Sequence, residues 1–196
     1  MPSRGFTLIE LLVVLTIGAI LIAAAVPSFQ WFIATTRTSN GANTLVAAFE
    51  LARSEAIRRN TVVSVCRTLD PNATEATVAC SNAAGGGYAV GDWGSGWVMF
   101  EKRGATAVGT YENGVDFILQ RQQPVGIGGW RLVMAGNRAG AAVAYDRFGT
   151  AASSVGTFSI DYRDPASATL TGAARCVVVA AVTGRITTNR PTAGVC

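Results

Sequence analysis

The sequence has no histidine, and Lys102 is the only lysine among its 16 basic residues. Without an imidazole, the chain lacks the commonest general base and the commonest metal ligand of proteins. Its serines therefore have no histidine partner for nucleophilic catalysis. We expect a protein that is not an enzyme and that carries no metal or other cofactor.

The charge and the length of the chain limit which classes of protein it can belong to. Charged residues make up 14% of the 196-residue chain, and the net charge is only +4. A balance this modest indicates no extended basic tail of the kind that binds nucleic acid or anionic lipid by itself. A chain of this length can form one domain with a buried core plus an appendage, but not two large domains.

A long apolar run at the start of the chain indicates what the appendage is. It spans Phe6 to Val26, which is 21 residues. At about 1.5 Å per residue the run is roughly 31 Å long as a helix, which is the thickness of a bilayer core. A secretory signal would have a shorter apolar stretch followed by a small-residue cleavage site. Because Arg4 precedes the run, we expect the leader to stay in the cytoplasm and the rest of the chain to be exported.

Glu10 is the one acidic residue in this run. A carboxylate in hydrocarbon costs about 2.5–3.5 kcal/mol near the middle of a span, so it needs a partner. Cleavage of the leader after Gly5 would give Phe6 a new α-amino group, four residues before the acid. That amine could neutralise Glu10 within one helix, or the acid of a second subunit between packed helices. The acid therefore predicts a device for assembling helices.

The stretch RGFTLIELLVVLTIGAILIAAAVPSF resembles the class III signal and N-terminal helix of type IV pilins and type II secretion pseudopilins. The resemblance implies that prepilin peptidase cuts after Gly5 and that Phe6 becomes the N-methylated first residue. It also implies that Glu10 acts in assembly and that Pro27 bends the helix. A plain membrane anchor with an incidental acid is the alternative. It is disfavoured because all four residues fall in the register of the motif.

The four cysteines lie beyond this run, separated by 14, 96 and 20 residues, and match no zinc-binding pattern. An even number of cysteines on the exported side of a membrane anchor indicates disulfides in an oxidising compartment. Three pairings are possible, of which we favour the two local ones, Cys66–Cys80 and Cys176–Cys196. Each closes a loop of about 15 to 20 residues and would contribute roughly 3 kcal/mol in the chain-entropy model.

A stripe of apolar residues at helical spacing predicts that the helix resumes after Pro27 and runs to about Arg59, with one face packed on a sheet. Glu55 can form an ion pair with Arg58 or Arg59 on the polar face. The stripe consists of Leu45, Phe49, Ala52 and Ala56.

The remainder of the chain is rich in β-branched and aromatic residues divided by turn residues, which predicts antiparallel strands. The segment Leu69–Gly96 is poor in apolar residues and is expected to be an irregular loop tied by a disulfide. The expected strands are Thr61–Arg67, Trp97–Lys102, Val115–Gln120, Trp130–Met134, Ala142–Asp146, Thr157–Tyr162, Ala174–Val182 and Arg185–Thr188.

A second resemblance covers most of the chain. The motifs LARSEAIRRNTVVSVC, DWGSGWVMFE, VAYDRFGTA and CVVVAAVTGRI are similar, in this order, to those of the GspH/FimT family of minor pilins and pseudopilins. The family implies an α+β, type IV pilin-like fold, in which a long N-terminal helix packs on an antiparallel β-sandwich-like globular head. Gly149 and Gly184 would then serve turns. The implied parts are a leader (1–5), a transmembrane and assembly helix (6–28), an amphipathic helix (29–60) and a β-rich globular domain (61–196).

The resemblance implies a minor subunit, at the initiating end or tip of a type IV pilus, with its head in the periplasm and its helix in the inner membrane. Its partners would be prepilin peptidase and other minor and major pilins or pseudopilins. One alternative is a minor pseudopilin of type II secretion, although two disulfides and the long loop favour a pilus.

A DNA-binding minor pilin for DNA uptake is the other alternative. Some relatives bind DNA through a Gly-Arg-x-Arg motif, and here Gly184 and Arg185 are present but Thr187 stands where the second arginine belongs. Arg190, three residues further on, is the candidate substitute, because phosphate contacts need charge and reach.

Overall fold

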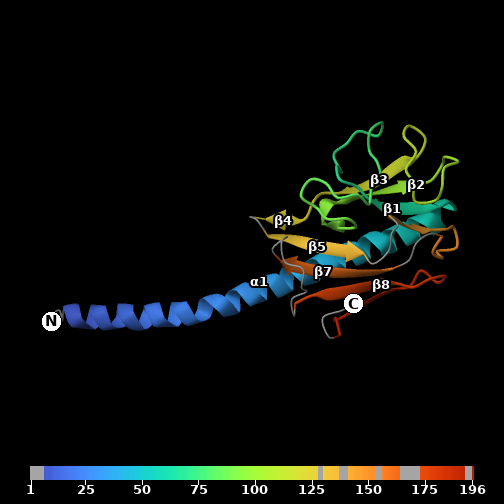
Figure 1. The fold of residues 1–196 in the computed structure, drawn as a ribbon. Coiled ribbons are helices and arrows are strands. Elements are labelled where there is room, and N and C mark those ends of the chain that lie inside the picture. Colours follow the sequence, from blue (N-terminus) through green and yellow to red (C-terminus); the bar gives the residue numbers. More distant parts are fainter. Residues whose placement is uncertain (1–6, 128–129, 137–140, 153–155, 164–172, 193–195) are drawn as a thin grey trace, which may run out of the picture.

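The computed structural model describes residues 7–127, 130–136, 141–152, 156–163, 173–192 and 196. The expected cleavage site at Gly5 and Phe6 therefore lies outside the described residues. One long helix projects from a head built of two sheets, as Figure 1 shows.

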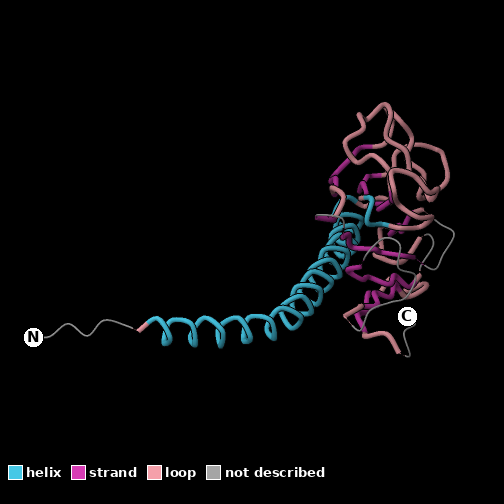
Figure 2. Tube along the Cα trace, turned by 60° about the vertical axis from the view of Figure 1, so that its left-hand side comes forward, coloured by secondary structure: helices cyan, strands magenta, loops and turns pink. Residues whose placement is uncertain are grey.

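Helix α1 spans Leu8–Arg59, a total of 52 residues. Thr7 caps its start, and Asn60 ends it in the left-handed conformation at φ 54°. The helix is continuous through Pro27, rather than stopping and resuming there. The proline has no N–H to donate, so one main-chain hydrogen bond of the helix is absent. The helix runs nearly straight from its N-terminal end and then curves toward the head, as the tube in Figure 2 shows.

The first sheet has four antiparallel strands in the order β3-β2-β1-β6. The expected strand at Val115–Gln120 is displaced by two residues. The reason is local: Val115 and Asp116 donate their N–H groups to the carbonyl of Glu112 in a turn, so neither joins the sheet. The strands are β1 (Val63–Arg67), β2 (Trp97–Glu101), β3 (Phe117–Gln122) and β6 (Ala142–Tyr145).

The second sheet has five antiparallel strands in the order β4-β5-β7-β8-β9. The short strand β4 is absent from the sequence prediction, because a two-residue strand has no periodicity to recognise. The strands are β4 (Gly126–Ile127), β5 (Trp130–Gly136), β7 (Thr157–Arg163), β8 (Arg175–Val179) and β9 (Ile186–Asn189).

The C-terminal half of α1 packs against both sheets, which confirms the expected α+β arrangement. All four residues of the predicted stripe are fully buried there: Leu45, Phe49, Ala52 and Ala56. Phe49 packs edge-on against Trp93 of the 3-10 helix η1 (Trp93–Ser95) with ring centroids 5.9 Å apart. Beside the stripe, Glu55 pairs with Arg58 and with Arg59, both at 2.6 Å.

Two disulfides join Cys66 to Cys80 and Cys176 to Cys196, which are the local pairings that the spacing favours. The first closes part of the irregular segment Leu69–Gly96, whose regular structure among its described residues is η1.

Arg67 organises that irregular segment from within. Its side chain is fully buried, and its guanidinium donates hydrogen bonds to four main-chain carbonyls, those of Ser81, Ala83, Ala89 and Asp92. Burial lowers the pKa of Arg67, although an arginine remains charged at any physiological pH. The loop is therefore irregular in its backbone but fixed by a single cation.

Candidate assembly surface on the N-terminal helix

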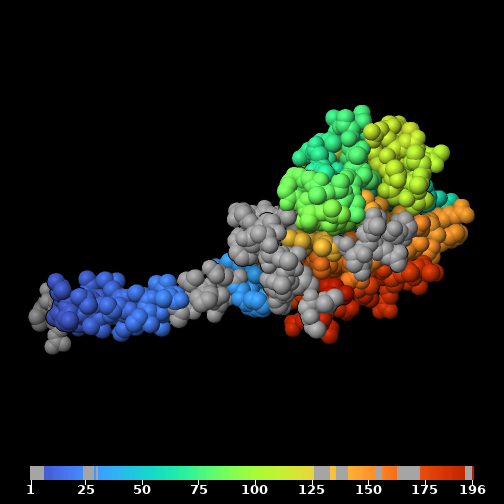
Figure 3. Space-filling view, in the orientation of Figure 1, coloured from blue at the N-terminus to red at the C-terminus, as the bar shows by residue number. Residues whose placement is uncertain are grey.

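The N-terminal part of α1 is an apolar arm without a covering surface in the monomer. We define the arm as residues 8–32, and Figure 3 shows its first part, residues 8–23, standing clear of the head. Large apolar side chains between Leu8 and Ile22 are 45% to 81% exposed. Phe29, Trp31 and Phe32 extend this exposed surface. Since burial of apolar area contributes about 25 cal/mol per Å², such an arm is stable only in lipid or against other helices.

The sequence predicts that the apolar run from Phe6 to Val26 spans a membrane. Within the described part of the chain, no helix combines the length and the hydropathy of a membrane span.

Glu10 is held at the first turn of α1 by a capping box. Its carboxylate accepts hydrogen bonds from the main-chain N–H and from the hydroxyl of Thr7, both at 2.9 Å. In return, the N–H of Glu10 donates to the Thr7 hydroxyl at 3.3 Å. These donors are neutral, so they fix the position of the acid without balancing its charge. The amine of Phe6, the expected counter-ion, lies outside the described residues.

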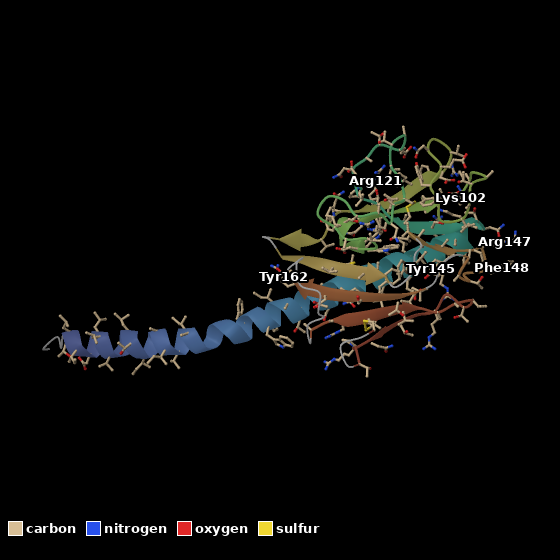
Figure 4. The ribbon with its side chains drawn as sticks, viewed as in Figure 1. Lys102, Arg121, Tyr145, Arg147, Phe148 and Tyr162 are labelled. Carbon is tan, nitrogen blue, oxygen red and sulfur yellow. A yellow bond between two sulfur atoms is a disulfide. The ribbon has the colours of Figure 1, made fainter. Side chains whose placement is uncertain are left out.

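The arm leaves the head at a polar anchor that the sequence did not reveal. The main-chain N–H of Tyr162 on β7 donates to the buried hydroxyl of Thr38 at 3.1 Å. Arg37 donates to the Tyr162 hydroxyl and lies 4.9 Å from the centre of its ring. Figure 4 places Tyr162 at the end of the head where the arm begins. These contacts hold α1 to β7 just after the arm ends.

A buried ion pair between Lys102 and Asp116 stabilises the loop between β2 and β3. The ammonium of Lys102 lies 2.8 Å from the carboxylate of Asp116, whose side chain is fully buried. The same carboxylate accepts hydrogen bonds from the main-chain N–H groups of Arg103, Gly104 and Glu112. Lys102 stands out in the sequence because it is the only lysine. The spacing of the acidic residues does not identify Asp116 as its partner.

The two arginines expected to contact DNA are not brought together. Arg185 lies immediately before β9 and Arg190 immediately after it. Five residues of extended chain span roughly 16 Å, and side chains five positions apart point to opposite faces of a strand. In a Gly-Arg-x-Arg motif the two arginines would share a face about 7 Å apart. Arg190 therefore does not reproduce the missing second arginine.

The exposed apolar arm, its capped acid and the antiparallel head define a type IV pilin-like subunit. Residues 41–184 match the family described as Type II transport protein GspH, and residues 1–26 match the prokaryotic N-terminal methylation motif. The chain belongs to the GspH family and is a minor pilin or pseudopilin. The family and the fold are those of structural subunits.

Two solved structures of the type IV minor pilin FimU from Pseudomonas aeruginosa resemble this fold. The structure in space group P21 has a TM-score of 0.51 with 18% sequence identity, covering 79% of this chain and 89% of that one. The structure in space group P65 has a TM-score of 0.49 with 18% identity, covering 77% and 91%. No curated protein sequence matches significantly.

Proposed function

We propose that this chain is a minor subunit at the initiating end or tip of a type IV pilus. The leader, residues 1–5, is removed by prepilin peptidase, and Phe6 is then N-methylated. Residues 6–28 anchor the subunit in the inner membrane and later join the helical core of the filament. The amphipathic helix 29–60 carries the β-rich domain, residues 61–196, on the periplasmic side.

One observation carries this proposal: a single acid is fixed in a largely apolar and exposed arm. The carboxylate of Glu10 is held at the first turn of α1 by Thr7, next to the site where a new amine would form. In lipid, an uncompensated carboxylate costs about 2.5–3.5 kcal/mol near the centre of a span. An amine on a neighbouring helix would offset that cost, so the monomer in the membrane gains stability when it joins other pilins.

Replacement of the acid tests the proposal in the native host. Glu10→Val should leave membrane insertion and leader removal intact but abolish surface filaments. Thr16→Val is the matched control, because Thr16 is also a polar residue of the arm but its hydroxyl donates to its own helix, to the carbonyl of Val13 at 2.8 Å. Thr16→Val should assemble like the wild type. Normal filaments from Glu10→Val would contradict the proposal.

The family description favours a second candidate, a minor pseudopilin of the type II secretion system. The same pair of variants separates the two. If Glu10→Val leaves surface filaments intact and instead stops the export of folded proteins to the medium, the secretion role is correct.

A further inference from the structure

The end of the head opposite the arm carries exposed apolar side chains. Val182, Phe148 and Ile57 are 78%, 71% and 52% exposed. Figure 4 places Phe148 at the end of the head away from the arm. We refer to these three residues as the distal apolar surface.

The segments that carry these three residues are in contact. A Cβ atom built on Gly149, next to Phe148, would lie 2.8 Å from the side chain of Ile57. The main-chain N–H of Ala151 donates to the carbonyl of Val182 at 3.3 Å. The end of α1, the turn after β6 and the turn between β8 and β9 therefore converge on one surface.

The turn that presents Val182 is strained. The N–H of Thr183 donates to the carbonyl of Ala181 at 2.7 Å, which closes a three-residue γ-turn around Val182. Val182 has a φ of 67°, in the left-handed region that a β-branched residue adopts only at an energetic cost. Glycine would adopt this φ without strain. The chain therefore carries an exposed valine at a position where the backbone conformation favours glycine.

The turn that presents Phe148 is rigid. The carboxylate of Asp146 accepts hydrogen bonds from the N–H groups of Phe148 and Thr150, both at 2.9 Å, and from the hydroxyl of Thr150 at 2.6 Å. Gly149 completes the turn at a φ of 76°. A turn whose main chain is held this way loses little backbone entropy when a partner covers Phe148.

Arginines surround the distal apolar surface. Arg147 lies over the ring of Phe148 with its guanidinium carbon 5.0 Å from the ring centre. The Arg53 Nε atom would lie 3.1 Å from a Cβ on Gly149, and Arg185 is exposed just beyond the strained turn. Among the described residues, the acids beside these three arginines are the exposed Glu50 and also Asp146, whose carboxylate is occupied by its own turn. The surface fits an apolar partner with an acidic margin.

We propose that the distal apolar surface docks the head of a different pilin subunit, which is the next one along the filament axis. This inference rests on the proposed function. If subunits share the direction of α1, the end of each head opposite its arm faces the neighbouring subunit on the tip side, so the proposal places this chain just below the outermost subunit of the initiating end. The occupant would present an apolar patch bordered by Asp or Glu, which the arginines recognise.

Two substitutions test this surface in the full-length protein. Val182→Gly removes the exposed side chain and also relieves the backbone strain, so its melting temperature in detergent should be unchanged or higher. Phe148→Ser removes the second apolar side chain. Together they should reduce the number of surface filaments by roughly tenfold or more, as expected for the truncation of interface anchors.

Matched controls exist elsewhere on the head. Val90 is 67% exposed, and Phe117 is 45% exposed with Arg103 lying 5.1 Å from its ring centre. Val90→Gly and Phe117→Ser should leave filament numbers unchanged. If Glu10→Val abolishes filaments but Val182→Gly with Phe148→Ser does not, the docking surface is wrong and the proposed function stands. If neither change affects filaments, the proposed function itself fails.

A photo-crosslinking residue in place of Phe148 identifies the occupant in the native host. The expected adduct contains a different chain with a processed, N-methylated first residue, detected by mass spectrometry. Adducts only with a second copy of this chain, with phospholipid or with DNA, or the absence of any adduct, would overturn the inference.

Discussion

The carboxylate of Glu10 is bound twice by Thr7, through the main-chain N–H and through the hydroxyl, each at 2.9 Å. The acid that we propose to act in assembly is therefore positioned within its own chain. Because its donors are neutral, the negative charge stays uncompensated, as the proposed pairing with an amine requires.

Thr7→Ala should weaken assembly less than Glu10→Val does. It removes the hydroxyl cap, at a cost of about 0.5–2 kcal/mol to the first turn, but keeps the main-chain N–H that holds the acid. Counts of surface filaments measure the effect, and the mass of the mature chain shows whether leader removal is unchanged. Thr7→Ala and Glu10→Val could instead reduce the number of surface filaments equally, with the leader still removed. That result would show that the main-chain N–H of Thr7 cannot hold the acid in place without the hydroxyl.

Lys102→Met should destabilise the head by about 3–5 kcal/mol, because it leaves the buried carboxylate of Asp116 without its cation. The double variant Lys102→Met with Asp116→Asn should recover part of that loss. Chemical denaturation of the full-length chain in detergent measures both. A loss below about 1 kcal/mol for Lys102→Met, a value typical of surface pairs, would contradict the role of this ion pair.

The same ion pair predicts a pH dependence. Burial alone would raise the pKa of Asp116, but hydrogen bonds from Lys102 and from three main-chain N–H groups outweigh burial, so its pKa lies below the ordinary value. The unfolded carboxyl takes up protons at a higher pH than the folded one. The contribution to stability is therefore full above about pH 4 and is lost as the pH falls through the lowered pKa. In Lys102→Met the loss should begin at a higher pH than in the wild type, as seen in melting curves between pH 7 and pH 2.

Gly184→Ala should destabilise the head by about 2–5 kcal/mol, because it combines left-handed strain with a clash. Gly184 has a φ of 64°, and a Cβ there would lie 2.8 Å from the ring of Tyr145. Gly114→Ala is the control for strain alone, since Gly114 has a φ of 75° and no heavy atom within 4 Å of the added carbon. Gly114→Ala should lower the free energy of unfolding by about 1–2 kcal/mol. Equal melting temperatures for the two variants would show that the clash relaxes.

Removal of either disulfide should lower the free energy of unfolding by about 3 kcal/mol. Cys66→Ser with Cys80→Ser should also release the segment that Arg67 holds, since Arg67 follows the first cysteine and donates to the carbonyl of Ser81, next to the second. Hydrogen exchange should then rise in that segment. Cys176→Ser with Cys196→Ser is the control, and it should leave exchange there unchanged. If protection from hydrogen exchange is unaltered after loss of the Cys66–Cys80 disulfide, Arg67 alone is sufficient to hold the segment in place.

Arg185→Gln with Arg190→Gln should leave the affinity for duplex DNA and its salt dependence unchanged. The two residues stand before and after β9, so extended geometry separates their Cα atoms by roughly 16 Å and points the side chains to opposite faces, unlike the pair in a Gly-Arg-x-Arg motif. Titration of the full-length chain with DNA at two salt concentrations measures both quantities. A weaker affinity together with a shallower salt slope would support the DNA-uptake alternative.

Periodic features of this protein were predictable from the sequence. The stripe that includes Leu45 and Phe49 is buried as expected, because helical spacing by itself places those residues on one face. Both disulfide pairings follow from short loops between cysteines. Strand β3 was misplaced by two residues, since a turn at Glu112 uses N–H groups that an isolated strand pattern assigns to the sheet.

Contacts between distant residues were not predictable. The contact between Arg37 and Tyr162 joins residues 125 positions apart, and nothing in the spacing of either residue indicates the other. Val182 looked like part of a strand, because valine favours extended backbone, but the tight connection to β9 requires a left-handed φ there. The assembly residues could be proposed from a motif, whereas the distal apolar surface needed the folded turns.

The most direct test is the mass of the N-terminal peptide of this protein purified from its native host. The proposed function predicts a chain that begins at Phe6 and carries one added methyl group on its α-amine, with residues 1–5 absent. A chain that retains Met1 to Gly5 and has an unmodified start would contradict it.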